Sequence, residues 1–260
     1  MIYDDFSKPG WPRDTWVEWR YPAVDLWDPA TVVLCPGAPA NSMSVELKVF
    51  TRSHSNHVTA LASTSRVFDL SASEGFTVRA DISVETFGTE GNPHGLPPGD
   101  PRLAAGALVL IDSTTGMVFD FFISNDCITP LYERLPIARE HLGAYPAFSR
   151  LLAPVPTTRG AWRTFETRYD RCADVVEWCV DGKVIARRDQ AGAPIGRNAP
   201  VVKWNSLRVG VGLFTLLDDL CDDQVRADDY PRIKGCIPDN RHDRFGQGAR
   251  ISVRNLDILV

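Results

Sequence analysis

The sequence predicts an all-β fold, and three observations support that prediction. Side chains in residues 161–189 alternate every second position, which is the period of a β-strand with two different faces. Asp181-Gly182 separates two of these strands and favours a type I′ hairpin, because that turn needs positive φ at both central residues. Similar alternating segments recur along the 260 residues, and only residues 136–152 have a helical pattern. We therefore expect one β-sandwich domain with a single short helical segment.

The alternating segments place the expected strands. Residues 161–189 should form three consecutive antiparallel strands, at 162–169, 175–180 and 183–188. Further strands are expected at residues 2–7, 28–40, 44–52, 58–62, 66–70, 75–85, 105–111, 117–125, 206–216 and 249–259. The Gly/Pro-rich residues 86–101 should form a loop at the rim of a binding face.

Composition excludes several classes of protein. Apolar residues make up 44% of the chain and charged residues 23%, which is ordinary for a globular domain. The net charge of −5 does not suggest a nucleic-acid partner, and no apolar run is long enough to span a membrane. The first residues, MIYDDFSKPGW, lack the basic and apolar regions of a signal peptide, so we expect a cytoplasmic protein.

Metal and cofactor sites are not expected. The six cysteines have no CxxC or Cys/His spacing and should be reduced, although a bridge between Cys221 and Cys236 is the alternative. His54 and His57 share a polar loop but lack a third ligand. No phosphate-binding Gly loop, G-x-S-x-G elbow, H-E-x-x-H or dinucleotide fingerprint is present, so no cofactor is predicted.

One hairpin motif points to a family. Residues 160–166 read GAWRTFE, and residues 177–183 read EWCVDGK. This pair resembles the hairpin of the concanavalin A-like lectin/glucanase superfamily, which includes laminarinase-type glycoside hydrolases and laminin G-like modules; a generic hairpin is the alternative. The resemblance implies a two-sheet antiparallel jelly roll whose concave face holds the ligand, with the first and last strands paired. By the same resemblance, Asp4, Asp5 and Asp257 match structural calcium ligands of some relatives in position, although solvated turn carboxylates are the simpler interpretation.

The family's hydrolytic motif is incomplete in this chain. Laminarinase-like relatives carry E-x-D-x-x-E on the strand that corresponds to residues 117–125, with the outer glutamates as nucleophile and acid/base. If Asp120 is matched to the central aspartate, Val118 and Ile123 stand in the two glutamate positions. Retaining hydrolysis needs two carboxyls about 5 Å apart, so this chemistry should not be carried over.

Asp120 nevertheless stands out as a carboxyl among apolar residues. Alternation places Val118, Asp120, Phe122 and Ser124 on the concave side and the intervening residues in the core. Such surroundings can raise the pKa of a carboxyl and suit it to acid/base work, whereas an ion pair with a neighbouring Arg is the alternative. Two further candidate catalytic groups are Glu133 and His141, which follows Glu140.

Aromatic and polar residues supply the candidate binding groups. Residues 11–27 contain four Trp and one Tyr, and such side chains stack on sugars or flat apolar ligands, unless they fill the core. The predicted substrate-binding residues are Trp16, Trp19, Arg20, Phe122, Asn125, Arg134 and Tyr145. Residues 217–248, acidic and then basic, should form a lid over the concave face.

Three functions are compatible with these residues. The first is a cofactor-free cyclase, isomerase or lyase that acts on a small, partly apolar metabolite in the concave face. The alternative is a lectin-like carbohydrate-binding protein without catalysis, and the least favoured is a glycoside hydrolase with relocated carboxylates. All three imply a small-molecule ligand and leave the oligomeric state open. The functions differ in the shape of site that they predict: an enzyme needs a closed pocket, whereas a lectin needs an open groove.

Overall fold

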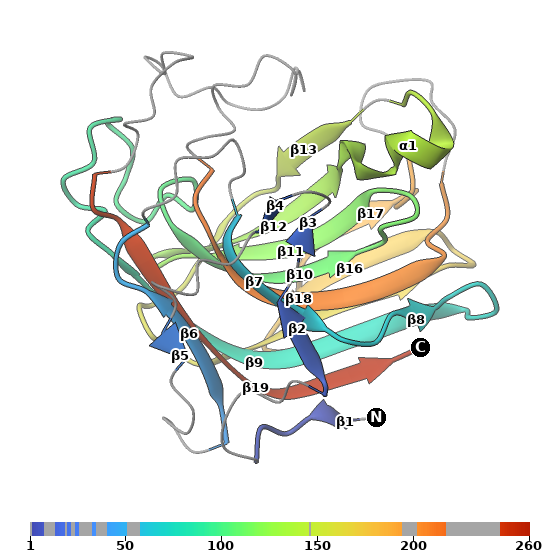
Figure 1. The fold of residues 1–260 in the computed structure, drawn as a ribbon, viewed down its shortest axis with the longest axis horizontal. Coiled ribbons are helices and arrows are strands. Elements are labelled where there is room, and N and C mark those ends of the chain that lie inside the picture. The colour runs from blue at the N-terminus through green and yellow to red at the C-terminus, as the bar shows by residue number, and fades with distance from the viewer. Residues whose placement is uncertain are drawn as a thin grey trace.

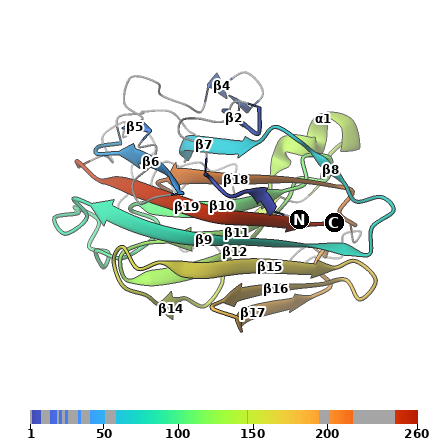
Figure 2. The same ribbon diagram turned by 90° about the horizontal axis from the view of Figure 1, so that it is seen from below.

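Two antiparallel sheets packed face to face form the protein (Figures 1 and 2), as seen in a computed structural model. The structure describes residues 2–7, 14–18, 20–21, 24–25, 33–34, 41–50, 58–145, 147–193, 202–216 and 245–260. The predicted jelly-roll sandwich is confirmed. The predicted lid at 217–248 and the Cys221–Cys236 pair fall almost wholly outside the described residues, so they stay predictions.

The eight-stranded sheet contains the hairpin that carries the family resemblance. Its order is β17-β16-β15-β9-β19-β6-β5, and β1 pairs with β19. The bounds of these strands are β1 Ile2–Asp4, β5 Val33–Leu34, β6 Met43–Leu47, β9 Gly75–Phe87, β15 Arg163–Asp170, β16 Val175–Val180, β17 Lys183–Asp189 and β19 Gly248–Leu259.

The nine-stranded sheet faces it across the core. Its order is β13-β12-β11-β10-β18-β7-β2, with β14 paired to β12 and β8 paired to β18. These strands are β2 Trp16–Glu18, β7 Val58–Thr64, β8 Phe68–Asp69, β10 Ala105–Ile111, β11 Met117–Ile123, β12 Cys127–Arg134, β13 Phe148–Leu151, β14 Val155–Pro156 and β18 Ser206–Phe214. A two-stranded ribbon joins β3 Arg20–Tyr21 to β4 Val24–Asp25.

Two predicted features of the eight-stranded sheet are confirmed. β15, β16 and β17 form the expected antiparallel meander, and both turn residues have positive φ, 50° at Asp181 and 77° at Gly182. The first and last strands pair, since Ile2 lies opposite Asp257 (Figure 1). Cys127, Cys172 and Cys179 are free thiols. No helix in the described part of the chain is long and apolar enough to cross a bilayer.

The prediction for residues 126–152 was partly wrong. Residues 127–134, for which no strand was predicted, form the inner strand β12, and the helical pattern of 136–152 yields only a 3-10 turn at Pro136–Ala138 and the short α1 at Arg139–Leu142. The remainder contributes β13, which pairs with residues 131–134 of β12. Pro130 cannot donate a ladder hydrogen bond, and it lies between the parts of β12 that pair with β13 and β14.

The interior between the sheets is apolar and rich in aromatic rings. The predicted division of β11 is found, because Met117, Phe119, Phe121 and Ile123 all belong to the buried cluster between the sheets. The ring of Phe119 stacks on that of Trp204 with 4.5 Å between centroids. This packing fixes β11, so that its alternate residues must point to the other side of the nine-stranded sheet.

A buried carboxylate fixes the turn that leads into β11. Asp112, fully buried, accepts hydrogen bonds from the Thr114 amide (2.8 Å) and hydroxyl (2.6 Å) in its own turn. It also accepts from the Asn205 amide (2.8 Å) and the Ser206 hydroxyl (2.7 Å), which precede and open β18. One side chain therefore holds the β10–β11 hairpin against the start of β18.

We expect Asp112→Ala to destabilise the protein by about 3 kcal/mol, because it leaves several buried donors without an acceptor. Asp112→Asn, which keeps one acceptor oxygen, should lose less. Urea unfolding followed by fluorescence measures both, and a loss below about 1 kcal/mol for Asp112→Ala would show that the turn does not depend on this carboxylate.

Candidate functional site

The candidate site lies on the outer face of the nine-stranded sheet, meaning the face turned away from the eight-stranded sheet. β18, β10, β11 and β12 lie side by side there (Figure 1). Val118 and Phe122 of β11 belong to a second buried apolar cluster on this face, separate from the core between the sheets. Its other members are Leu61, Ala105, Ala107, Val109, Ile111, Leu131, Phe214 and Leu216. The sequence prediction for the two faces of β11 therefore holds.

Two carboxyls meet in this apolar face. Asp120 lies directly opposite Leu131, and Glu133 lies directly opposite Val118, so the two acids are diagonal neighbours on β11 and β12. Diagonal positions in an antiparallel pair are about 7–8 Å apart, within reach of longer side chains. Asp120 is 3% exposed and Glu133 5%. The pair is therefore enclosed, on the second and third strands from one edge of the sheet.

Burial and charge act together on Asp120. Its neighbours across both strand pairs are Val109 and Leu131, which offer no polar contact. Burial raises the pKa of Asp120 well above its ordinary value of 3.8, and the nearby Glu133 raises it further, although a hydrogen bond from the Leu110 amide (3.1 Å) opposes them. No cation among the described residues pairs with Asp120. The alternative prediction, an ion pair with a neighbouring Arg, is therefore not found in that part of the chain.

The second carboxyl has a hydroxyl partner. The Ser149 hydroxyl of β13 lies directly across from Glu133 and donates to its Oε1. Ser149 was missing from the predicted site because β13 was interpreted as helix. Alternation in residues 127–134 was the available signal, because it places Thr129, Leu131 and Glu133 on one side of a strand.

The glycines of β18 do not open a space beside the pair. Gly210 and Gly212 lie on the outer face, opposite Val109 and Ala107. A Cβ at either position would approach Leu61 Cδ1 to 2.9 Å, because the Leu61 side chain of β7 lies across them. The glycines therefore serve close packing.

The other predicted residues of β11, β12 and the helical segment lie away from the carboxyl pair. Arg134 packs its guanidinium 3.9 Å from the Tyr145 ring centroid and donates to Thr115 O, on the opposite side of β12 from Glu133. The exposed His141 contacts Thr114 O at 2.8 Å through Nε2. Asn125 uses its amide to bond both backbone groups of Thr86.

The predicted aromatic residues near the N-terminus are likewise not placed at the pair. Trp16 is fully buried in the core between the sheets, and its indole N–H donates to Asp4 Oδ2 at 2.8 Å. Trp19 lies outside the described residues, as does the side chain of Arg20. Of the ten predicted site residues, the structure brings together Asp120, Glu133 and Phe122.

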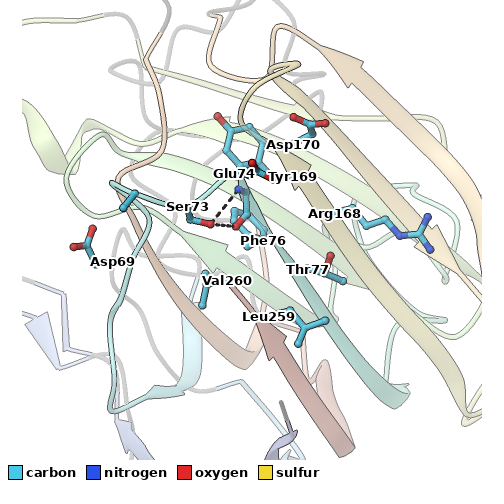
Figure 3. Close-up of a pocket in the computed structure, with 12 residues that line it drawn as sticks. Asp69, Ser73, Glu74, Phe76, Thr77, Arg168, Tyr169, Asp170, Leu259 and Val260 are labelled. Carbon is cyan, nitrogen blue, oxygen red and sulfur yellow. Dashed lines mark hydrogen bonds between the residues drawn. The ribbon is translucent and has the colours of Figure 1, made fainter.

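A separate groove lies at one end of the eight-stranded sheet (Figure 3). It has a volume of about 780 Å³ and is lined by the start of β9, the end of β15 and the last residues of β19. Its polar side chains are engaged locally: Ser73 bonds Gly75, Asp69 accepts from the Ser71 amide, and Arg168 pairs with Glu166. The groove therefore carries no group as distinctive as the carboxyl pair.

No metal centre is evident in the part of the chain that the structure describes. No group of three or more His, Cys, Asp or Glu side chains is arranged there to hold an ion. The two Asp4 oxygens accept from the Phe6 amide and from Trp16, and Asp5 accepts from the Ser7 amide. These carboxylates act as turn and packing partners.

The arrangement places two buried carboxyls side by side, and burial raises the pKa of Asp120. A buried carboxyl that keeps its proton can donate a hydrogen bond or a proton, and an ionised neighbour can accept one. Val118 and Ile123 occupy the positions of the glutamates that retaining hydrolysis by the laminarinase motif would need.

Solved structures share this fold at low sequence identity. A glycoside hydrolase family 16 endo-glucanase from Bacteroides ovatus, solved with a bound ligand, is 12% identical with a TM-score of 0.56; the alignment covers 98% of each chain. A LamA variant from Zobellia galactanivorans, in complex with laminaritriose and laminaritetraose, is 9% identical with a TM-score of 0.55 and 98% and 96% coverage. At these identities the likeness establishes the fold alone.

Sequence comparison identifies the family. Over 40 residues the chain is 58% identical to the uncharacterized protein L829 of Acanthamoeba polyphaga mimivirus, a match to 15% of this chain and only 9% of the viral protein. The model of a family of unknown function, DUF6081, matches residues 25–260. With that match and a concanavalin A-like jelly roll, the chain belongs to the DUF6081 family.

Proposed function

We propose that the protein binds a small carbohydrate or a similar uncharged polyol on the outer face of the nine-stranded sheet, around Asp120 and Glu133. The observation that carries the proposal is the pair of buried carboxyls beside the apolar cluster of this face. Small-molecule sites typically combine apolar walls with a few convergent polar groups. Phe122 and Phe214, 5.2 Å apart between ring centroids, belong to the apolar cluster of the same face.

The fold supports this ligand class. Its structural neighbours include a glucanase and a LamA variant whose crystals contain laminari-oligosaccharides. Here the glutamates of the laminarinase motif are replaced by Val118 and Ile123, so the proposal is binding without retaining hydrolysis. The enclosure of Asp120 and Glu133 favours a ligand of one or a few sugar units over a long polysaccharide.

We expect Glu133→Gln to weaken binding of the best-bound sugar about tenfold, because a charged acceptor for ligand hydroxyls becomes a neutral one. Calorimetry against a panel of mono- to tetrasaccharides measures the effect. Glu177→Gln, on β16 of the other sheet, is the matched control and should bind as the wild type does. Absence of wild-type binding across the panel, or equal binding by Glu133→Gln, would contradict the proposal.

A second candidate is a cofactor-free enzyme acting on a small, partly apolar metabolite by cyclisation, isomerisation or elimination. The observation that favours it is the enclosure of Asp120, whose pKa is raised by burial, since a carboxyl with a raised pKa suits general acid catalysis.

Asp120→Asn separates this candidate from binding alone. The amide keeps a hydrogen-bond donor and an acceptor but cannot transfer a proton, so an enzyme should retain ligand binding and lose turnover by about 100-fold or more. Mass spectrometry of a metabolite extract incubated with each protein shows whether any product mass depends on Asp120. If wild type and Asp120→Asn give identical products, Asp120 is not a catalytic acid.

The protonation of Asp120 also predicts how stability depends on pH. The unfolded chain releases this proton near 3.8, whereas the folded protein holds it to higher pH, so stability falls as pH rises from about 4 toward the raised pKa. At pH 8 the free energy of unfolding of Asp120→Asn should therefore exceed that of the wild type, by about 1.4 kcal/mol for each unit by which the folded-state pKa of Asp120 is raised between pH 4 and pH 8. At pH 4 the two proteins should be equally stable. Urea unfolding at both pH values tests this, with exposed Asp189→Asn as the control.

A further inference from the structure

Arg134 is a buried cation for which the described residues supply no carboxylate partner. It ends β12 and is only 4% exposed, on the opposite side of the strand from Glu133. Its Nε donates to Thr115 O at 3.2 Å, and its guanidinium carbon lies 3.9 Å from the centroid of the Tyr145 ring. A carbonyl and a ring attract the cation without cancelling its charge, whereas buried charges are normally paired with an opposite charge.

The electrostatic surroundings of Arg134 agree with its contacts. Burial lowers the pKa of its guanidinium, and Tyr145 and Tyr132 are the side chains that raise it. Arginine nevertheless stays charged at neutral pH. Asp112, the acid at the start of the neighbouring turn, accepts instead from four other donors. In the described part of the chain the charge of Arg134 is therefore not offset by an acid.

A second cation lies against the same aromatic ring. The guanidinium carbon of Arg139, the exposed first residue of α1, is 5.5 Å from the Tyr145 centroid, and its Nη2 donates to Tyr145 O at 2.9 Å. Glu140, the acid of α1, is exposed and forms no ion pair with a described residue. Two cations this close repel each other unless an anion lies beside them.

Hydrogen bonds hold the ring and both cations in place at the end of β12, where the chain continues toward α1 (Figure 1). The Tyr145 hydroxyl donates to Leu135 O at 2.5 Å and accepts from the Ala138 amide at 3.0 Å. The ring is thus tied to the segment between β12 and α1, and each guanidinium is tied to a backbone carbonyl. Groups that are already ordered lose little entropy when they bind a ligand.

We infer that Arg134 and Arg139 form a binding site for an oxyanion, the phosphoryl or carboxylate group of a small ligand, beside the Tyr145 ring. Among the described residues the terminal N–H groups of Arg134 have no acceptor, and they are not fully enclosed, unlike Nε of Arg188. A guanidinium fork matches two oxygens of one oxyanion, whose charge would offset both cations. The site goes beyond the proposed function, because it lies on the other side of β12 from Glu133.

NMR spectra of the arginine Nε–H groups, recorded during titration of the full chain with sodium phosphate and with sodium succinate, test the inference. The Arg134 signal should shift and reach saturation. Arg139→Gln, an exposed change that should not affect folding, is expected to weaken binding about tenfold, because a charge-assisted contact is lost. Arg134→Lys should weaken it at least as much, since lysine lacks the planar fork. Arg187→Gln, on β17 of the other sheet, is the control and should bind as the wild type does.

Saturation with phosphate alone identifies a phosphoryl ligand, saturation with succinate alone identifies a carboxylate ligand, and either result supports the site. The inference is overturned if neither salt saturates the Arg134 signal, if sodium chloride at the same ionic strength shifts it equally, or if Arg139→Gln binds as tightly as Arg187→Gln. Should Arg134→Lys fail to fold, the comparison of Arg139→Gln with Arg187→Gln decides alone. The sugar-binding panel is a separate measurement, so either proposal can fail without the other.

Discussion

Strand β11 carries apolar side chains on both faces. Both the core between the sheets and the apolar cluster on the outer face are built on these side chains. Met117, Phe119 and Phe121 pack into the core between the sheets, while Val118 and Phe122 pack into the outer cluster. A strand buried on both sides leaves no solvated position for a charge. Asp120 stands in the middle of this strand. Because an unpaired charge there would be costly, its carboxyl must be neutral or must have a polar partner.

The same constraint separates this protein from the glucanases whose fold it shares. A strand bearing two ionised glutamates would need a solvated or polar cleft above it, and here Val118 and Ile123 remove that need. What remains is one acid on β11 and a second on β12, enclosed together. The jelly roll of this chain therefore has two enclosed carboxyls on one sheet face but lacks the two glutamates that retaining hydrolysis by the laminarinase motif requires.

Local patterns predicted those parts of the fold that local chemistry decides. The Asp181-Gly182 turn and the two faces of β11 follow from φ preferences and a two-residue period, and both are found. β12 was missed because Pro130 and the charged Glu133 and Arg134 resemble a loop; only its partners make it a strand. Asp120, Glu133 and Phe122 were predicted, but Ser149 required knowledge of which strand lies beside β12, which a single sequence does not contain.

Pairing across strands also determines which groups contact each of the two acids, and these contacts cannot be inferred from the residue types alone. Glu133 and Asp120 have the same functional group, and neither burial nor spacing along the chain tells them apart. Their cross-strand contacts differ: the Ser149 hydroxyl of β13 donates to Glu133, whereas the Leu110 amide of β10 donates to Asp120.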